Sequence, residues 1–252
     1  MSRIPIALQL YSVRHEAERD LAATLKAVAE MGYDGVEFAG FYGHSAQDVR
    51  AMADAAGLVI VGNHTRYDAL QPDAIAETIA YNKVLGSVSM VVPGLPAECR
   101  ETREDWLKTA AWFNDLAKKL APEGFFTGYH NHWVEFQALG GELPLETLYN
   151  NTDAAVTMQL DLGNAMHGGG DPIKYLKMYP GRSRTIHLKE WSPDDSGAII
   201  GQGVVPWDEV FQLCETTGAT EWYIVENEGD PEKMPQLERA KACVGALKAM
   251  GK

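Results

Sequence analysis

Short apolar segments alternate along the chain with longer amphipathic segments rich in alanine. The apolar segments predict eight β-strands, at residues 6–12, 35–40, 58–64, 87–94, 125–131, 155–162, 185–191 and 222–228. The amphipathic segments predict helices near residues 20–31, 45–56, 72–85, 102–121, 144–150, 171–178, 207–217 and 233–250. Eight strand–helix units in 252 residues are typical of one closed parallel barrel. We therefore expect a single (β/α)8 TIM barrel domain over residues 1–252.

An open, doubly wound sheet is the alternative arrangement of the same elements. Such folds usually carry a GxGxxG motif after the first strand or a GxxxxGK[ST] motif, and the chain contains neither of them. No linker, low-complexity segment or block of charge divides the chain. The pattern therefore favours the barrel.

Composition and charge exclude several classes of partner. The chain has 22 Lys and Arg residues against 35 Asp and Glu residues, a formal net charge of −13, and no basic run. Binding to a phosphate backbone needs clustered basic residues, so we expect neither nucleic acid nor an anionic membrane as a partner. The three cysteines are widely spaced, and the first sixteen residues lack the apolar core of a signal peptide. No apolar stretch approaches the ~20 residues that span a bilayer, so we expect a cytoplasmic location.

The histidines are concentrated in one part of the predicted fold. They are His15, His44, His64, His130, His132, His167 and His187. On the strand assignment above, each lies near the carboxyl end of a strand or in the loop after it, and none lies in a helix. Barrel enzymes place their active sites at this end, so the cluster indicates metal binding or proton transfer.

Acidic residues occur at the same end of the barrel. Asp161, His187 and Glu226 end the sixth, seventh and eighth predicted strands, and Glu135 follows the fifth. Each of them alone has an ordinary structural interpretation, as a turn residue, a core histidine or an ion pair. Together, three carboxylates and one imidazole suit Mn²⁺, Mg²⁺ or Co²⁺ better than zinc.

Several motifs resemble those of the sugar phosphate isomerase/epimerase family, which has the xylose-isomerase-like barrel. They are LQLYSVR, YHNHWVEF, DLGNA, HLKEW, GQG and WYIVENE, and the central one resembles a YHNHxxEF subgroup. The resemblance implies one divalent metal ion held by Asp161, His187, Glu226 and a fourth ligand. Many relatives have a glutamate at the end of strand five, where this chain has His130. Either Glu135 reaches the metal, which leaves His130 or His132 for proton transfer, or His130 is the ligand and Glu135 contacts the substrate. We favour the first alternative.

The resemblance, together with these residues, implies a metal-dependent sugar isomerase or epimerase that removes a proton next to a carbonyl group and passes through an enediolate. The expected metal is Mn²⁺, with Mg²⁺ and Co²⁺ as alternatives. Candidates for proton transfer are Glu135, Glu226, His130 and His132. Lys189 either polarises the substrate carbonyl or forms a local ion pair. Gln9, His64, Trp133 and Trp191 are candidate substrate contacts.

The substrate and the outcome of the reaction stay open at this point. The loop containing Gly201 and Gly203 is typical of a phosphate site, but the loop after strand eight, ENEGDPEK, is acidic. We therefore expect a neutral sugar or keto-sugar. A lyase or dehydratase acting on an inosose or a 3-keto-glycoside shares the first step and is the main alternative. A non-catalytic sugar-binding barrel or a DNA-repair endonuclease is less expected, and a homo-oligomer is compatible with aromatic residues in the loops.

Overall fold

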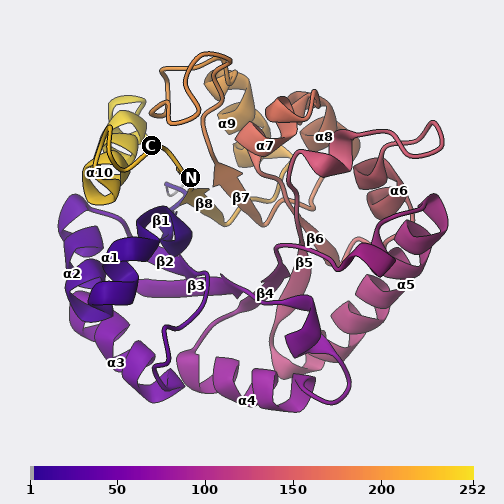
Figure 1. Ribbon diagram of the computed structural model, residues 1–252, viewed down its shortest axis with the longest axis horizontal. Coiled ribbons are helices and arrows are strands. Elements are labelled where there is room, and N and C mark those ends of the chain that lie inside the picture. Colours follow the sequence, from indigo (N-terminus) through magenta and orange to yellow (C-terminus); the bar gives the residue numbers. More distant parts are fainter. Residues whose placement is uncertain (1–2) are drawn as a thin grey trace.

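Eight parallel strands form one sheet that curls into a barrel, with helices around its outside (Figure 1). The computed structural model describes residues 3–252. Residues 1 and 2, which belong to the predicted domain and to the segment expected to lack a signal peptide, lie outside the described residues. The strands are β1 Ile6–Gln9, β2 Gly35–Phe38, β3 Val59–His64, β4 Ser89–Val92, β5 Phe126–His130, β6 Val156–Gln159, β7 Thr185–Leu188 and β8 Trp222–Val225. The prediction of an eight-stranded parallel barrel is confirmed.

The barrel closes between β6 and β7. The hydrogen-bonded strand order runs from β6 through β5, β4, β3, β2, β1 and β8 to β7. The first and last strands of this order meet just beyond the end of β6, where Asp161 and His187 form a parallel bridge. The backbone N–H of His187 donates to the carbonyl of Leu160 at 2.9 Å. The seam of the barrel therefore brings Asp161 and His187 side by side.

Ten α-helices cover the barrel in the described part of the chain. They are α1 Arg14–Arg19, α2 Leu21–Met31, α3 Ala46–Ala56, α4 Ile75–Leu85, α5 Arg103–Leu120, α6 Pro144–Asn150, α7 Leu162–His167, α8 Pro172–Met178, α9 Trp207–Thr216 and α10 Gln236–Ala249. None of these helices is long and apolar enough to cross a membrane.

The prediction that no histidine lies in a helix is wrong for two of the seven. His15 lies in α1 and His167 lies in α7, two short helices that the apolar pattern does not distinguish from loops. The reason is visible at α7, where the carboxylate of Asp161 accepts a hydrogen bond from the backbone N–H of Asn164 at 2.6 Å. This N-terminal cap starts a helix directly after the strand.

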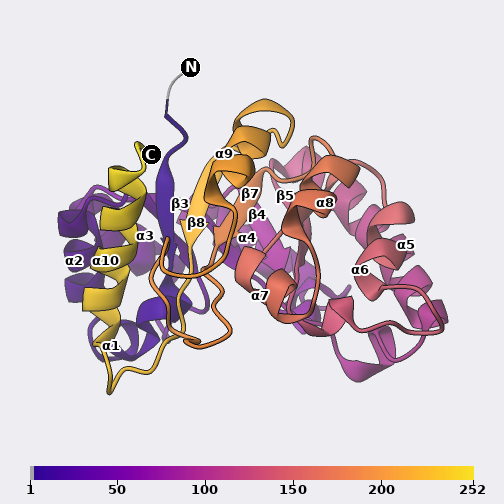
Figure 2. The ribbon, with the colours of Figure 1, turned by 90° about the horizontal axis from the view of Figure 1, so that it is seen from above.

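The interior of the barrel has an apolar base and a polar layer above it. Ala7, Val61 and Ile224 form a small buried cluster inside the barrel, separate from the large core between the sheet and the helices. Successive side chains of a strand point to opposite faces, so Gln9, two residues after Ala7, also points inward. It is fully buried together with Glu37 and Gln159. Figure 2 shows the barrel from the side, with α1, which follows β1, at one end of it.

Candidate metal centre

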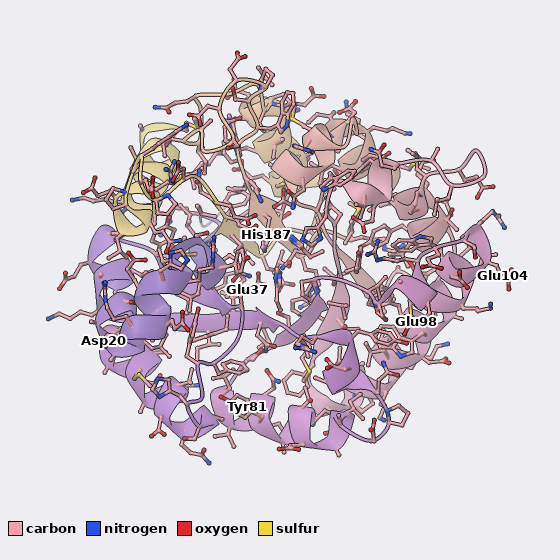
Figure 3. All side chains as sticks on the ribbon, in the orientation of Figure 1. Asp20, Glu37, Tyr81, Glu98, Glu104 and His187 are labelled. Atoms are coloured by element: carbon pink, nitrogen blue, oxygen red, sulfur yellow. The ribbon has the colours of Figure 1, made fainter. Side chains whose placement is uncertain are left out.

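Four buried side chains meet at the carboxyl ends of strands β5 to β8. His130 ends β5, Asp161 follows β6, His187 lies in β7 and Glu226 follows β8. One potential ligand atom from each of the four lies within 4.8 Å of the others. Figure 3 places His187 near the middle of the barrel, with Glu37 beside it. We call His130, Asp161, His187 and Glu226 the four-residue cluster.

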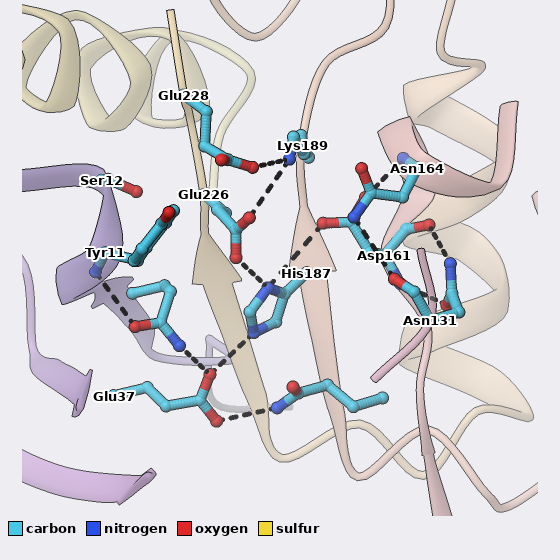
Figure 4. A network of polar contacts seen from close by, with 12 residues as sticks. Tyr11, Ser12, Glu37, Asn131, Asp161, Asn164, His187, Lys189, Glu226 and Glu228 are labelled. Atoms are coloured by element: carbon cyan, nitrogen blue, oxygen red, sulfur yellow. Dashed lines mark hydrogen bonds and ion pairs between the residues drawn. The ribbon is translucent and has the colours of Figure 1, made fainter. Parts of the chain in front are cut away.

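The imidazole of His187 lies between carboxylates on both of its edges (Figure 4). Its Nδ1 is 2.9 Å from Oε2 of Glu226 and 3.9 Å from Oδ2 of Asp161, and its Nε2 is 2.7 Å from Oε2 of Glu37. Burial lowers the pKa of His187, but the charges of Glu37 and Glu226 and the hydrogen bonds to them outweigh it and raise the pKa to about 10. In the metal-free protein the ring therefore carries both protons at neutral pH.

Glu37, which the sequence analysis missed, is the main partner of His187 below the cluster. Its carboxylate is fully buried and accepts hydrogen bonds from Gln9 Nε2 at 2.7 Å and Gln159 Nε2 at 2.8 Å. Burial raises the pKa of Glu37, but the nearby His64 and His187 outweigh it and lower the pKa below its ordinary value. A glutamate in the middle of the buried segment GVEF was the signal in the sequence, because a charge is almost never fully buried without partners.

Asn131 and Asn164 hold Asp161 in place. The side-chain oxygen of Asn131 accepts from the backbone N–H of Asp161 at 2.9 Å, and its amide donates to the carbonyl of Asp161 at 3.2 Å. Oδ1 of Asp161 caps α7, whereas its buried Oδ2 has no hydrogen-bond partner within residues 3–252. Burial raises the pKa of Asp161 to about 7, although Lys189 opposes this.

His130 is the neutral imidazole of the cluster. Burial lowers its pKa well below the ordinary value, and the neighbouring His187 and His64 lower it further. Its buried Nδ1 also lacks a hydrogen-bond partner in the described part of the protein. Buried polar atoms almost always have a partner, so each unpaired one needs an explanation. Two unpaired atoms among four converging donor groups fit a divalent metal ion held by His130, Asp161, His187 and Glu226.

Glu135 lies outside the four-residue cluster. Its buried carboxylate accepts hydrogen bonds from the Tyr129 hydroxyl at 2.7 Å and from the backbone N–H of His132 at 2.6 Å. Three residues separate the end of β5 from a short 3-10 helix, Val134–Phe136, and this turn directs Glu135 back toward Tyr129. The geometry thus places His130, not Glu135, among the potential ligands, which is the alternative that we did not favour from the sequence.

Lys189 forms ion pairs with two carboxylates at the edge of the cluster. Its Nζ is 3.2 Å from Oε1 of Glu226 and also contacts Glu228 (Figure 4). Burial lowers the pKa of Lys189, but Glu226, Asp161 and Glu228 outweigh it and raise the pKa above its ordinary value. In Glu226, burial raises the pKa, but Lys189 and His187 lower it well below the ordinary value. The sequence analysis left open whether Lys189 polarises the substrate carbonyl or forms a local ion pair, and these contacts show the ion pair.

A cavity of about 720 Å³ opens above the cluster, and its walls are mainly apolar. Around the cluster it is lined by Tyr11, His64, His130, His132, Glu226 and Glu228. Gln9 does not line this cavity; it is buried in the barrel and donates a hydrogen bond to Glu37. The two tryptophans predicted as substrate contacts lie elsewhere: Trp133 lines a separate cavity of about 380 Å³, and Trp191 is half-buried against the core.

The loop after β7 that contains Gly201 and Gly203 wraps around a buried carboxylate. Glu190 accepts hydrogen bonds from the backbone N–H groups of Gly201 at 2.6 Å and Val205 at 3.2 Å, and from Nε1 of Trp207 at 2.8 Å. A side chain at Gly203 would place Cβ 2.5 Å from Glu190 Oε1, so only glycine fits there. The donors that resemble a phosphate site are therefore occupied by the protein itself.

Residues 25–250 match the model of a protein family described as the xylose isomerase-like TIM barrel. A sugar phosphate isomerase/epimerase from Parabacteroides distasonis is 26% identical, with a TM-score of 0.85, and the match covers 98% of this chain and 95% of that one. A structure of the IOLI protein with a bound zinc atom is 17% identical with a TM-score of 0.75, covers 97% of both chains, and shows the fold alone.

An inosose dehydratase from Bacillus thuringiensis is 30% identical over 158 residues. This match covers 55% of this chain and 52% of that protein, so the chain spans about half the length of the curated relatives it matches.

Proposed function

Because the chain belongs to the xylose isomerase-like TIM barrel family, we propose that it is a divalent-metal-dependent sugar isomerase or epimerase. The observation that carries this proposal is the four-residue cluster, which lies beside a cavity of about 720 Å³, large enough for a sugar. Two buried atoms of the cluster have no hydrogen-bond partner among the described residues. The Parabacteroides relative, which is described as a sugar phosphate isomerase/epimerase and matches nearly the whole chain, supports the same reaction class.

His130, Asp161, His187 and Glu226 would hold the metal ion in this proposal. A bound divalent ion would supply Lewis-acid polarisation of the substrate carbonyl. We keep Mn²⁺ as the proposed metal, but two imidazoles beside two carboxylates favour Co²⁺ or Zn²⁺ over Mg²⁺ as the alternatives. Nε2 of His187 donates to Glu37, which fixes the ring so that Nδ1 faces the cluster.

His132 is our candidate for the base that removes the proton next to the carbonyl. It is exposed and lines the cavity, and its ring centroid is 5.0 Å from that of His130. Glu135 fixes the backbone of His132 and thereby positions it. Glu228 lines another wall, after β8, and could return the proton at the neighbouring carbon. We propose that Lys189 stays protonated and offsets the negative charge of the enediolate.

A substrate without phosphate fits the cavity better than a sugar phosphate. Glu190 uses the backbone N–H groups of the glycine loop, and Glu226 and Glu228 add negative charge to the wall. The basic residue at the rim, Arg66, is exposed and paired with Asp68 at 2.7 Å. We therefore propose a neutral sugar or keto-sugar as the substrate.

Dehydration of a keto-sugar is the second candidate, and the inosose dehydratase relatives favour it. The first step is the same: a base takes the proton beside the carbonyl. The electron pair then expels the hydroxyl group on the next carbon, which leaves as water after it takes a proton from an acid. The two candidates differ only in whether the carbon–oxygen bond breaks.

Proton exchange in D₂O tests both candidates. Mn²⁺-loaded protein would be incubated with ketoses, inososes and 3-keto-glycosides, and the products followed by NMR. Deuterium beside the carbonyl of a recovered or rearranged sugar supports the isomerase, and loss of a hydroxyl or glycosidic substituent supports the lyase. The absence of exchange despite stoichiometric bound metal would refute both and leave a sugar-binding barrel.

Glu226→Gln provides the matched test of the cluster. This variant should lose metal occupancy and turnover, because it removes one charged donor from the cluster and one of the two hydrogen-bonded carboxylate partners of both His187 and Lys189. Glu104→Gln, on the exposed start of α5, should behave like the wild type. Wild-type rates in Glu226→Gln would remove Glu226 from the site.

A further inference from the structure

The cavity above the four-residue cluster extends well beyond the groups proposed to react. From His130 and Glu226 it continues over the loops after β2 and β3 to helix α4, where Phe41, Ala69, Ala74 and Tyr81 line it. Figure 3 shows Tyr81 on α4, away from His187 and Glu37 at the barrel centre. Cavities of about 300–1,000 Å³ are typical of drug-sized ligands. At about 720 Å³, this one is larger than a single hexose requires.

The far part of the cavity is an aromatic wall. The rings of Phe41 and Tyr81 pack with their centroids 4.6 Å apart, and Phe41 also packs on Phe38 at 5.5 Å. The hydroxyl of Tyr81 donates to the carbonyl of His44 at 3.0 Å, which fixes the orientation of the ring. Ala69 and Ala74, which have small side chains, line the same cavity. We call Phe41, Ala69, Ala74 and Tyr81 the aromatic wall.

Three polar side chains beside the aromatic wall, Asn63, Asn82 and Thr78, are already hydrogen-bonded within the protein, whereas the exposed Glu77 also lines the cavity. Asn63 Nδ2 donates to Asn82 Oδ1 at 2.5 Å, and Asn63 Oδ1 accepts from the hydroxyl of Thr65. Asn82 Nδ2 donates to the carbonyl of Thr78 at 2.9 Å, and the hydroxyl of Thr78 donates to the carbonyl of Ala69 at 2.7 Å. Their hydrogen-bonding capacity is therefore largely used within the protein.

We propose that the aromatic wall binds a flat, apolar, aromatic substituent carried by the sugar, so that the preferred substrate class is an aryl-substituted keto-sugar. This inference rests on the proposed function, because it places the carbonyl end of the sugar at the four-residue cluster. Fixed rings favour stacking with another aromatic ring. A second sugar would bring hydroxyl groups to a wall that has few free partners for them, and each unpaired group weakens binding.

A matched pair of ligands tests the inference directly. The probes are 4-nitrophenyl and methyl 3-keto-β-glucosides, which differ only in the substituent, and a 3-keto-disaccharide represents a second sugar. Dissociation constants would be measured by isothermal titration calorimetry on the Mn²⁺-loaded protein. We expect the aryl compound to bind about tenfold more tightly than the methyl compound, a difference of about 1.4 kcal/mol, and the disaccharide to show no such gain.

Two variants locate the effect. Tyr81→Ala removes the ring, and Ala74→Phe adds a large side chain to this part of the cavity. Both should abolish the aryl preference and leave the methyl compound's affinity unchanged. Trp133→Ala, in the separate cavity, is the control and should keep the preference. Ala74→Phe retains the Tyr81 ring, so it keeps the test valid if Tyr81→Ala does not fold.

Equal binding of the aryl and methyl compounds, a preference that survives both wall variants, or a gain for the disaccharide instead would overturn the inference. The proposed function is tested separately by deuterium exchange. Exchange with free ketoses and no aryl preference would refute the aromatic subsite alone. An aryl preference without exchange on any sugar would refute the enzyme and retain the subsite.

Discussion

Metal binding should release about one proton per ion near pH 8, and the proton should come from His187. The carboxylates of Glu37 and Glu226 flank this imidazole at 2.7 and 2.9 Å. Burial lowers the pKa of His187, but these carboxylates raise it to about 10. At pH 8 the ring is thus about 99% protonated in the metal-free protein. A histidine nitrogen binds a metal through its lone pair, so the Nδ1 proton must leave.

The sign and size of the pH effect follow from this exchange. Asp161, with a pKa raised by burial to about 7, is already about 90% ionised at pH 8 and adds little. From pH 8 to pH 9, where His187 alone is still largely protonated, the affinity for Mn²⁺ should increase about tenfold. Below pH 7 the dependence should become steeper, because Asp161 must also lose its proton.

Calorimetry in two buffers with different ionisation enthalpies measures the released protons directly. The slope of the observed enthalpy against the buffer enthalpy should give about one proton at pH 8. Glu37→Gln removes the charge that contributes most to the raised pKa of His187, so fewer protons should be released in this variant. Glu104→Gln should still release about one. A wild-type count near zero, or an affinity that does not change between pH 8 and 9, would refute the assignment of His187 as a ligand.

Three further predictions test the surroundings of the cluster. Glu135→Ala should lower the free energy of unfolding by about 2–4 kcal/mol, because the buried Tyr129 hydroxyl and the His132 N–H lose a charged acceptor. Urea denaturation measures this free energy, and the control variant Glu104→Ala should change it by less than ~0.5 kcal/mol. Metal-free wild-type protein should lose stability relative to Asp161→Asn as the pH rises from about 4 to about 7, because the folded state raises the pKa of Asp161 and so favours its protonated form. Melting temperatures of the two proteins at pH 5 and pH 8 measure this loss. A difference in melting temperature that stays constant between these pH values would contradict it. Lys189→Met removes a positive charge next to Glu226, so it should bind Mn²⁺ severalfold more tightly and yet turn over more slowly; weaker metal binding in titration would contradict the ion-pair argument.

The fold could be predicted from the sequence because every strand contributes the same local signal. Each of the eight strands lies in a short, mainly apolar run, and the parallel barrel is the arrangement that buries eight such runs at once. The two short helices α1 and α7 were missed because a helix of six residues has too few turns for an apolar periodicity. The start of α7 depends on the Asp161 cap, and the sequence analysis considered Asp161 as a turn residue or a metal ligand without predicting a helix after it.

The site was partly predictable for a related reason. Asp161, His187 and Glu226 stand at the ends of consecutive strands, and the barrel geometry alone brings such positions together. Glu37 is the third of the four residues of β2, the position that His187 holds in β7, but further apolar residues follow Glu37 in the sequence. The rule that searches strand ends therefore passes over it, although it is the carboxylate that orients His187. A search for charges inside apolar strands would have found it.

The choice between Glu135 and His130 shows where sequence reasoning stops. His130 is the last residue of a strand, so its side-chain direction follows from the two-residue period of that strand and points into the barrel. Glu135 comes five residues later, after the backbone has left the strand, and no period connects its direction to that of His130. Its position is decided by two hydrogen bonds, from the Tyr129 hydroxyl and the His132 backbone N–H, which turn the carboxylate away from the four-residue cluster. The same two bonds hold the segment that carries His132, so the conspicuous glutamate of the YHNHWVEF segment has a physical role outside the four-residue cluster: it fixes the loop that carries the candidate base.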